Sequence, residues 1–336
     1  MKHSLPSLRN NAILYPVAAL LFVAAAAFGL FCGSTPITLG DIFSAIRFGA
    51  VGPGERIFLF VRLPRTLGCL LAGAALAVAG GLIQNVLANS LASPSIIGVN
   101  SGAGLAVTLC TALGLYGGWQ LSFFAFLGAF GAVSLVSLGA KKWGASRGTV
   151  ILMGVAMNSI LGAVSDTVIT FFPEVGVMSN DFRVGDFSAV TYGKLIPAAM
   201  LIPGAILLLM TLCSELDVLT LGEDTARGLG LNTGRLRTVF LLLAALLAGC
   251  AVSLAGLLSF VGLLVPHAVR RLGVTLSRRL LPLCALFGGA FVALCDTAAR
   301  TLFAPYEIPV GILMAFLGAP FFLFILFKGK GGAWDA

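Results

Sequence analysis

The sequence predicts an all-α membrane protein, a single domain over 1–336 with about ten transmembrane helices. The chain has 336 residues, of which 59% are hydrophobic and only 10% charged, and its mean hydropathy is +1.04. A soluble domain carries about a quarter charged residues. Apolar blocks of about 20 residues, long enough to cross a bilayer as a helix, recur along the chain. They are continuous and rich in Ala, Leu and Gly, which favours helices over alternating membrane strands.

The remaining composition narrows the class further. The net charge of +8 sits in short loops between apolar blocks, as a topology signal does, so nucleic-acid binding is not expected. The seven cysteines lie mostly inside apolar runs without a CxxC pair, which is typical of small buried hydrophobes. The basic start, Met1–Asn11, precedes an apolar run without a clear cleavage site, which indicates a retained first helix.

The expected spans follow the apolar blocks in chain order. The stretch 236–271 is nearly unbroken, but as one helix it would measure about 54 Å, far more than a hydrocarbon core of about 30 Å needs. It must fold back, and Gly256 and Gly262 mark where it could do so. The ten predicted spans are 12–32, 66–87, 95–115, 119–139, 149–172, 192–213, 236–256, 257–271, 280–300 and 309–327.

Ten spans place both termini on one side of the membrane, and the basic residues indicate which side. With cytoplasmic termini, the cytoplasmic loops hold fourteen of the 21 lysines and arginines, so the positive-inside bias favours this orientation. The fourteen are Lys2, Arg9, Lys141, Lys142, Arg147, Arg227, Arg235, Arg237, Arg270, Arg271, Arg278, Arg279, Lys328 and Lys330.

An internal repeat connects two spans. "LLAGAALAVAGGL" (Leu70–Leu82) and "LLAGCAVSLAGLL" (Leu246–Leu258) match at eight of thirteen positions. The predicted topology runs the two copies in opposite directions, which is typical of inverted repeats in transport proteins. The halves are expected at about 12–172 and 192–327. Their glycines permit close helix contact, and tight packing alone would also explain them.

Three motifs are distinctive. The first is "VRLPRTLGCLLAGAALAVAGGLIQNVLANSLASPSIIGVNSGAG" (Val61–Gly104), with arginines at one end of a span and amides at the other. The second is "SFVGLLVPHAVRRLGV" (Ser259–Val274). The third is "DTAARTLFAPYEIPVGILMAFLGAPFFLFIL" (Asp296–Leu326).

In order and content these motifs resemble the FecCD-type permease subunits of ATP-binding-cassette (ABC) importers for iron–siderophores, haem and vitamin B12. Ser90 and Met314 depart from the usual proline and threonine of that family. The resemblance implies a homodimer in the lipid of a bacterial plasma (inner) membrane around a central pathway, with two cytoplasmic ATPase subunits and an extracytoplasmic solute-binding protein. The permease itself is then not an enzyme and binds no cofactor, because ATP and Mg²⁺ belong to the ATPase.

The polar stretch "LDVLTLGEDTARGLGLNTGRLR" (Leu216–Arg237) interrupts two apolar blocks on the predicted cytoplasmic side. Thr220 and Glu223 have capping-box spacing, and Leu221, Ala226 and Leu229 could form a small apolar face. A solvated loop is the alternative. Through the resemblance, 216–235 corresponds to the family's coupling element for the ATPase, with the candidate residues Thr220, Leu221, Gly222, Glu223, Asp224, Thr225, Ala226, Arg227, Gly228, Leu229 and Gly230.

Arginines near the outer ends of spans are candidates for docking the binding protein. Arg62, Arg65 and Arg300 match positions where the family's vitamin B12 permease presents arginines to acidic residues, and Arg56 lies nearby. Anchoring of span ends at the membrane surface is the alternative.

Further polar residues are candidates for the pathway. Ser146 and Thr149 lie in a loop where similar permeases narrow their pathway. Acids within spans are functional by default, so Asp166 could line the outer half, whereas Asp296 could pair with Arg300 one turn on. His267 is expected to make a structural hydrogen bond rather than bind metal. The pathway candidates are Ser146, Thr149, Gln84, Asn85, Asn89 and Asp166.

Function therefore has ranked alternatives. The first is an importer permease for a metal chelate, with ferric siderophore ahead of haem or cobalamin because it is the commonest family assignment. The second is a proton-coupled secondary transporter using Asp166 or Asp296. An intramembrane enzyme is remote, because the sequence has no GxxxxGK[ST] phosphate loop, no HExxH motif and no nucleophile–base pair.

Overall fold

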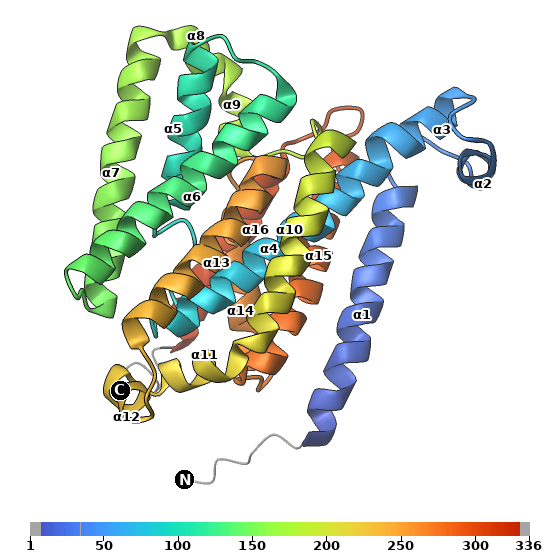
Figure 1. The fold of residues 1–336 in the computed structure, drawn as a ribbon. Helices are drawn as coiled ribbons and strands as arrows, with labels where there is room; N and C mark the ends of the chain where they lie inside the picture. The colour runs from blue at the N-terminus through green and yellow to red at the C-terminus, as the bar shows by residue number, and fades with distance from the viewer. Residues whose placement is uncertain (1–7, 34, 330–336) are drawn as a thin grey trace.

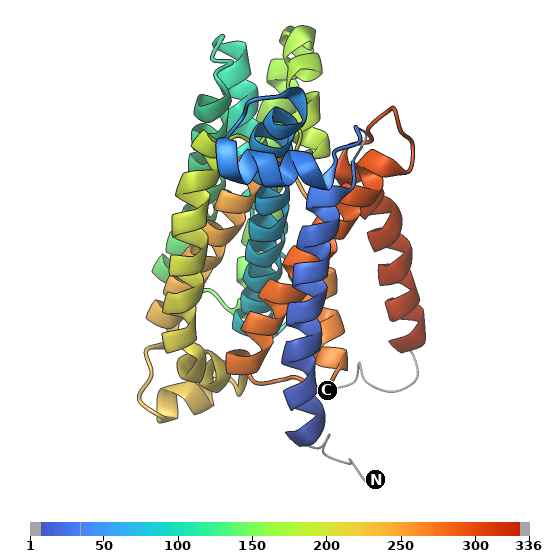
Figure 2. The same cartoon turned by 90° about the vertical axis from the view of Figure 1, so that its right-hand side faces the viewer.

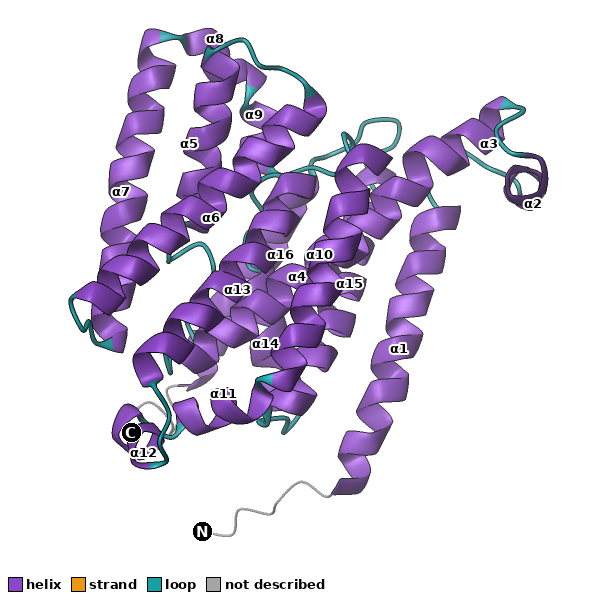
Figure 3. Ribbon diagram, in the orientation of Figure 1, coloured by secondary structure: helices purple, strands orange, loops and turns teal. Residues whose placement is uncertain are grey.

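The computed structural model describes residues 8–33 and 35–329, and all regular structure in this part of the chain is helical (Figure 3). The longer helices are α1 (Leu8–Phe31), α4 (Leu63–Val86), α5 (Val99–Ala112), α6 (Gly118–Lys142), α7 (Arg147–Phe171), α10 (Tyr192–Thr211), α13 (Thr233–Ala255), α14 (Val261–Arg271), α15 (Ser277–Thr301) and α16 (Val310–Gly329). The shorter ones are α2 (Leu39–Phe48), α3 (Pro53–Ile57), the π-helical turn η1 (Phe58–Arg62), α8 (Pro173–Met178), α9 (Asn180–Val184), α11 (Cys213–Thr220) and α12 (Glu223–Gly228).

Each predicted span coincides with one of the longer helices, but not all of them are long enough to cross alone. Within the described residues, seven helices are long and apolar enough to span a membrane, among them the continuous rod of α3, η1 and α4. α5 and α16 are shorter apolar helices. α14 has 11 residues, a length of about 17 Å. Length and composition therefore support seven crossings, and ten remains a prediction.

α4 is the centre of the bundle and packs against α13, α14 and α15 (Figure 1). In the rod of α3, η1 and α4, 89% of the most apolar 18-residue stretch is buried. The packing is close because small residues face each other: a Cβ on Gly73 would overlap the carbonyl of Gly288 in α15, and one on Gly80 that of Gly262 in α14. The Ala- and Gly-rich sequence of this span thus serves close helix contact.

The two copies of the repeated sequence, in α4 and α13, lie side by side. α4 packs along α15 of the second predicted half, and α13 packs along α6 of the first. Such reciprocal exchange is the arrangement that an inverted repeat produces. It supports the repeat, while the bounds of the two halves stay a prediction.

The fold-back predicted within 236–271 is confirmed, and Gly256 is where it begins. α13 ends at Ala255, Gly256 has φ +72°, and α14 starts at Val261. A positive φ suits glycine, which has no Cβ. The loop is held from outside, since Asp186 N–H donates to the carbonyl of Ala255 over 2.8 Å.

The bundle has two different ends. The lower end in Figure 1 carries α11 and α12, the α6–α7 loop, the start of α1 and the end of α16. The upper end carries α2, α3, α8 and α9; Figure 2 shows α2 and α3 across the top of α1. The described part of the predicted cytoplasmic loops lies at the lower end, whereas Lys2 and Lys330 lie outside the described residues. Which end faces the cytoplasm stays a prediction.

Candidate functional site

The polar stretch between α10 and α13 folds into two short helices rather than one. α11 ends at Thr220, and α12 begins at Glu223 after Gly222, whose φ of +119° breaks the helix. The predicted capping box is wrong: the Thr220 hydroxyl donates to the carbonyl of Asp217 over 2.6 Å, and no side chain caps α12. Glycine supplies the turn because it alone adopts that backbone conformation without strain.

α12 exposes only part of its predicted apolar face. Ala226 is fully buried, whereas Leu221 and Leu229 are 68% and 64% exposed. Asp224, Thr225, Arg227, Gly228 and Gly230 are also exposed on this element. These two large leucines flank α12 next to charged groups at the edge of the molecule, which gives this segment the composition of a contact surface.

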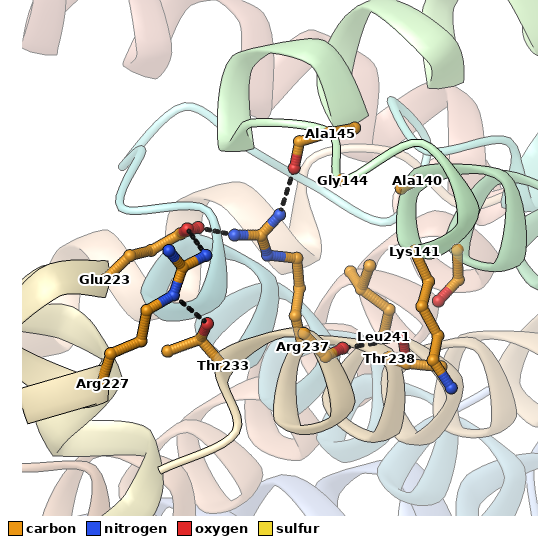
Figure 4. Close-up of a pocket in the computed structure, with 12 residues that line it drawn as sticks. Ala140, Lys141, Gly144, Ala145, Glu223, Arg227, Thr233, Arg237, Thr238 and Leu241 are labelled. Carbon is orange, nitrogen blue, oxygen red and sulfur yellow. Dashed lines mark hydrogen bonds and ion pairs between the residues drawn. The ribbon is translucent and has the colours of Figure 1, made fainter. Parts of the chain in front are cut away.

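Glu223 turns inward from the same helix and meets Arg227 and Arg237 (Figure 4), and it also lies near Arg147. Its carboxylate makes an ion pair with Arg237 of α13, lies 3.9 Å from Arg147 of α7 and lies 3.5 Å from Arg227 one turn along α12. The Arg237 side chain is 9% exposed and that of Glu223 27%. A partly buried carboxylate among three guanidinium groups is held much more firmly than a surface ion pair.

The same arginines hold the α6–α7 loop. Arg237 donates to the carbonyl of Ala145 over 2.6 Å, and Arg147 donates to the carbonyl of Leu219 in α11 over 2.6 Å. The loop is therefore attached to α11, α12 and α13 through charge-assisted hydrogen bonds. A cavity of about 70 Å³ adjoins the cluster and is lined by Lys141, Gly144 and Thr233 among others.

The loop contains the two gate candidates. Ser146 is the N-cap of α7: its hydroxyl accepts from Thr149 N–H over 3.2 Å and lies 2.9 Å from the Thr149 hydroxyl. Capping is a sufficient structural role for Ser146. Both residues are exposed in the single chain, so a second copy or a solute can reach them.

The amides at the lower end of α4 are engaged in hydrogen bonds within the chain. Gln84 and Asn85 are buried and accept hydrogen bonds from Arg270 of α14, and Asn85 donates to Ser277 over 2.9 Å. They join α4, α14 and α15 and are buried within the single chain, while a role in the pathway stays a prediction. Asn89 is half-buried and accepts from Leu91 N–H over 2.9 Å, which closes the turn after α4.

A second charged cluster closes the upper end. Arg65 of α4 donates to both oxygens of Asp296 in α15 over 3.1 Å, and to Glu307 before α16 over 2.7 Å. Arg300 lies 3.4 Å from Asp296, which confirms the predicted pairing one turn along the helix. The side chains of Arg65, Arg300 and Asp296 are 5%, 4% and 1% exposed. Buried charges at membrane depth need partners of this kind.

Three of the four docking candidates are buried in the single chain, and their docking role stays a prediction. Arg62 is buried and donates to the carbonyls of Leu30, Phe31 and Thr35, so it caps the end of α1. Arg65 and Arg300 belong to the Asp296 cluster. Arg56 alone is exposed. The sequence places these arginines at the end of a span, where a side chain can be either exposed or buried. Partners far away in the sequence bury Arg62 and Arg65.

Two other polar residues have modest roles in the described structure. Asp166 is 71% exposed on α7 and lies 3.8 Å from Arg183. His267 accepts from Arg271 over 3.2 Å, which is the structural hydrogen bond expected of it. Among the residues that the structure describes, no group of three or more His, Cys, Asp or Glu side chains could hold a metal ion.

The arginines that organise the lower end were not singled out by the sequence. Arg147, Arg237 and Arg270 were counted only as topology signals. Arg237 and Arg270 fall inside the predicted spans 236–256 and 257–271, and a basic residue inside a span needs a partner. That position was a usable signal that these side chains are paired inside the protein.

Comparison with known proteins agrees with this architecture. The model of the FecCD transport family matches residues 20–328. The Fe(3+)-citrate import system permease protein YfmD of Bacillus subtilis is 34% identical over 321 residues, which is 96% of each chain. The vitamin B12 import system permease protein BtuC of Yersinia pseudotuberculosis is 35% identical over 277 residues, 81% of this chain and 82% of that one.

Solved structures give the same result. One described as an inward-facing conformation of a metal-chelate type ABC transporter has a TM-score of 0.81 and 30% identity, and the match covers 95% of this chain and 99% of that chain. PsaBC from Streptococcus pneumoniae shares the fold, with a TM-score of 0.57, 17% identity and 85% and 94% coverage. By sequence and by structure, the chain belongs to the FecCD transport family.

Proposed function

We propose that this chain is the membrane permease of an ATP-driven importer for ferric siderophores. Its family consists of permeases of ABC importers for metal chelates, and the chain is a transport subunit rather than an enzyme. In the proposed complex, two copies form the pathway, two ATPase subunits bind ATP and Mg²⁺ at the α12 end, and a solute-binding protein delivers the chelate at the other end. Haem or cobalamin is the alternative cargo.

The observation that carries this proposal is α12 with its internal attachment. Leu221 and Leu229, which flank the helix, are exposed, while Glu223 points inward. A secondary transporter has no use for such an element. An ATPase subunit that contacts the leucines has a direct connection to the bundle, because Glu223 joins α12 to α7 and α13.

Force from the ATPase would reach the α6–α7 loop by this route. Displacing α12 moves Glu223, and Glu223 carries Arg147 and Arg237 with it. Arg237 holds Ala145 and Arg147 begins α7, so both ends of the loop follow. Ser146 and Thr149 then shift with the loop, which makes it a gate without any chemistry of its own.

α7 is the proposed wall of the pathway. Only 11% of the most apolar 18-residue stretch of α7 is buried within the single chain, so most of this helix surface is available to contact another molecule. One exposed stripe at helical spacing carries small or polar side chains: Ser159, Ala163, Asp166 and Thr170. The adjoining exposed face carries Ile160 and Val164. The polar stripe suits a hydrated pathway between two copies, and the apolar face suits the second copy or lipid.

The upper end is the proposed docking surface for the binding protein. Arg56 is the arginine available there, since Arg62, Arg65 and Arg300 are engaged within the chain. The chelate itself is selected largely by the binding protein, so binding assays with ferric siderophore, haem and cobalamin on that protein identify the cargo.

Reconstitution tests the function. Proteoliposomes containing the permease, its ATPase and the binding protein should accumulate ferric siderophore only with ATP and Mg²⁺. Omission of the ATPase should abolish uptake. Accumulation by the permease alone, driven by a pH gradient, would overturn the proposal in favour of proton-coupled transport.

A further inference from the structure

We infer that each chain binds one anionic phospholipid in a cavity between the upper halves of α6 and α10. The cavity measures about 280 Å³. Trp119, Phe123 and Phe126 of α6 and Leu201 of α10 form its walls, and Cys250 and Ser253 of α13 are its floor. This inference concerns the lipid surface of the protein and does not depend on the cargo or on the ATPase.

The hydroxyl groups in the lining of the cavity are not available to a bound molecule. Two hydroxyls face the cavity, but the Ser122 hydroxyl donates to the carbonyl of Gly118 over 3.1 Å and that of Ser253 to the carbonyl of Cys250 over 2.8 Å. Each is satisfied by its own helix. Below Lys194 the lining therefore offers no free polar group to hold ordered water, and an acyl chain fills this part of the cavity more favourably.

A single cation stands at the mouth of this cavity. Lys194, near the start of α10, is half-buried and lies beside Gly118, the first residue of α6. Within the described residues, its ammonium group has no ion-pair or hydrogen-bond partner. A cation beside an apolar cavity matches a phospholipid, with the phosphate at Lys194 and a fatty-acid chain below. Trp119 is placed as aromatic residues are at membrane interfaces.

The internal repeat explains why space remains there. α1 and α10 are the first helices of the two predicted halves. α1 packs directly along α15, with Phe22 against Gly289. α10 packs on α13, and its upper half stands away from α6, so the cavity occupies the place where the other half has a helix contact. Lipid in the cavity restores that contact.

The site faces the bilayer rather than another part of the chain. Leu127 and Leu135 continue the exposed surface of α6, and Met200 and Leu207 that of α10. All four are large and apolar. An exposed surface of this composition on a membrane bundle is a lipid contact, so phospholipid is the occupant present at high local concentration.

Native mass spectrometry of the purified permease with added phosphatidylglycerol or phosphatidylcholine tests the inference. Wild type should retain phosphatidylglycerol preferentially. Lys194→Glu should lower its apparent affinity at least about fivefold, since one basic residue near a charged lipid surface contributes about 1 kcal/mol. Lys142→Glu, at the opposite end of the same helix α6, makes the same charge change away from the cavity and should leave retention unchanged.

Fluorescence gives a readout that a folding defect does not imitate. In a variant whose other tryptophans are replaced (Trp143→Phe, Trp334→Phe), brominated phosphatidylglycerol should quench Trp119 more than brominated phosphatidylcholine. The difference should vanish with Lys194→Glu and persist with Lys194→Arg. Equal quenching by both lipids in the unaltered Lys194 background, or equal loss of retention in Lys194→Glu and Lys142→Glu, overturns the inference.

Discussion

Glu223 contacts three arginines, so a change at this residue acts on the lower end of the bundle as well as on a partner. Glu223→Gln keeps the size of the side chain but removes the charge that Arg147 and Arg237 share. ATPase subunits should still co-purify, while ATP-driven uptake should fall roughly tenfold, because charge-assisted hydrogen bonds contribute about 1.5–3 kcal/mol each. Uptake in proteoliposomes and ATPase co-purification are measured together.

Asp224→Asn is the matched control for this prediction. Asp224 is the next residue of α12, is exposed, and undergoes the same chemical change. It should transport normally. Uptake in Glu223→Gln equal to that of the control would contradict transmission through the cluster.

Asp296 is the other residue whose environment yields a prediction. It is 1% exposed and lies between Arg65 and Arg300. Asp296→Asn leaves two buried cations short of a carboxylate, and breaking a buried pair costs about 3–5 kcal/mol. The thermal unfolding midpoint in detergent should drop by several degrees. Asp166→Asn, which alters a largely exposed carboxylate, should leave the midpoint unchanged. An equal drop of the midpoint in both variants would contradict a specific structural role of Asp296.

α12 can be tested as an element without disturbing its interior contacts. A side chain added at Gly228 meets open space, so Gly228→Trp should fold normally. It places a large group beside Leu229, on the proposed ATPase contact. Co-purification of the ATPase should be lost while the unfolding midpoint is retained, and Gly228→Ala should behave as wild type. Normal co-purification of the ATPase with the Gly228→Trp variant would show that the ATPase contacts another part of the chain.

The break between α13 and α14 depends on one backbone conformation. Gly256 has φ +72°, and a Cβ there would overlap the carbonyl of Phe182. Gly256→Ala should therefore lower the yield of folded protein and its unfolding midpoint, as strain at such a position costs about 1–3 kcal/mol. Gly204→Ala, in open space within α10, is the control and should not destabilise the chain.

At this scale the sequence predicted a good deal of the fold. Apolar length located the helices, and the excessive length of 236–271 required the turn at Gly256. It did not predict that α11 and α12 separate at Gly222. The spacing of Thr220 and Glu223 suggested a local helix cap, whereas Glu223 pairs with Arg237, and the residue spacing within one short stretch does not reveal such a distant partner. Nor did it distinguish exposed from buried arginines, since the partners of Arg65 are far away in sequence.

For the whole molecule, the environment of α7 distinguishes a pathway from a lipid surface. In the proposed dimer, Ser159→Cys should react quickly with a hydrophilic, membrane-impermeant thiol reagent. Ile160→Cys, the neighbouring residue on the apolar face, should react at least about tenfold more slowly, because thiolate formation is suppressed in an apolar environment. Reaction rates measured by mass spectrometry compare the two. Equal rates would place the pathway elsewhere.

The Asp296 cluster also constrains how the chain is made. Helices enter the membrane in the order in which the ribosome delivers them. Arg65 is synthesised 231 residues before Asp296 and 242 before Glu307. During most of translation, Arg65 of α4 is therefore without these two carboxylates and without α13 and α15, the helices that later enclose α4, whereas Asp186, 3.8 Å from Arg65 in the folded chain, is made earlier. A chain that stops before α15 never acquires Asp296 and Glu307, so its Arg65 has Asp186 as the remaining carboxylate of the cluster.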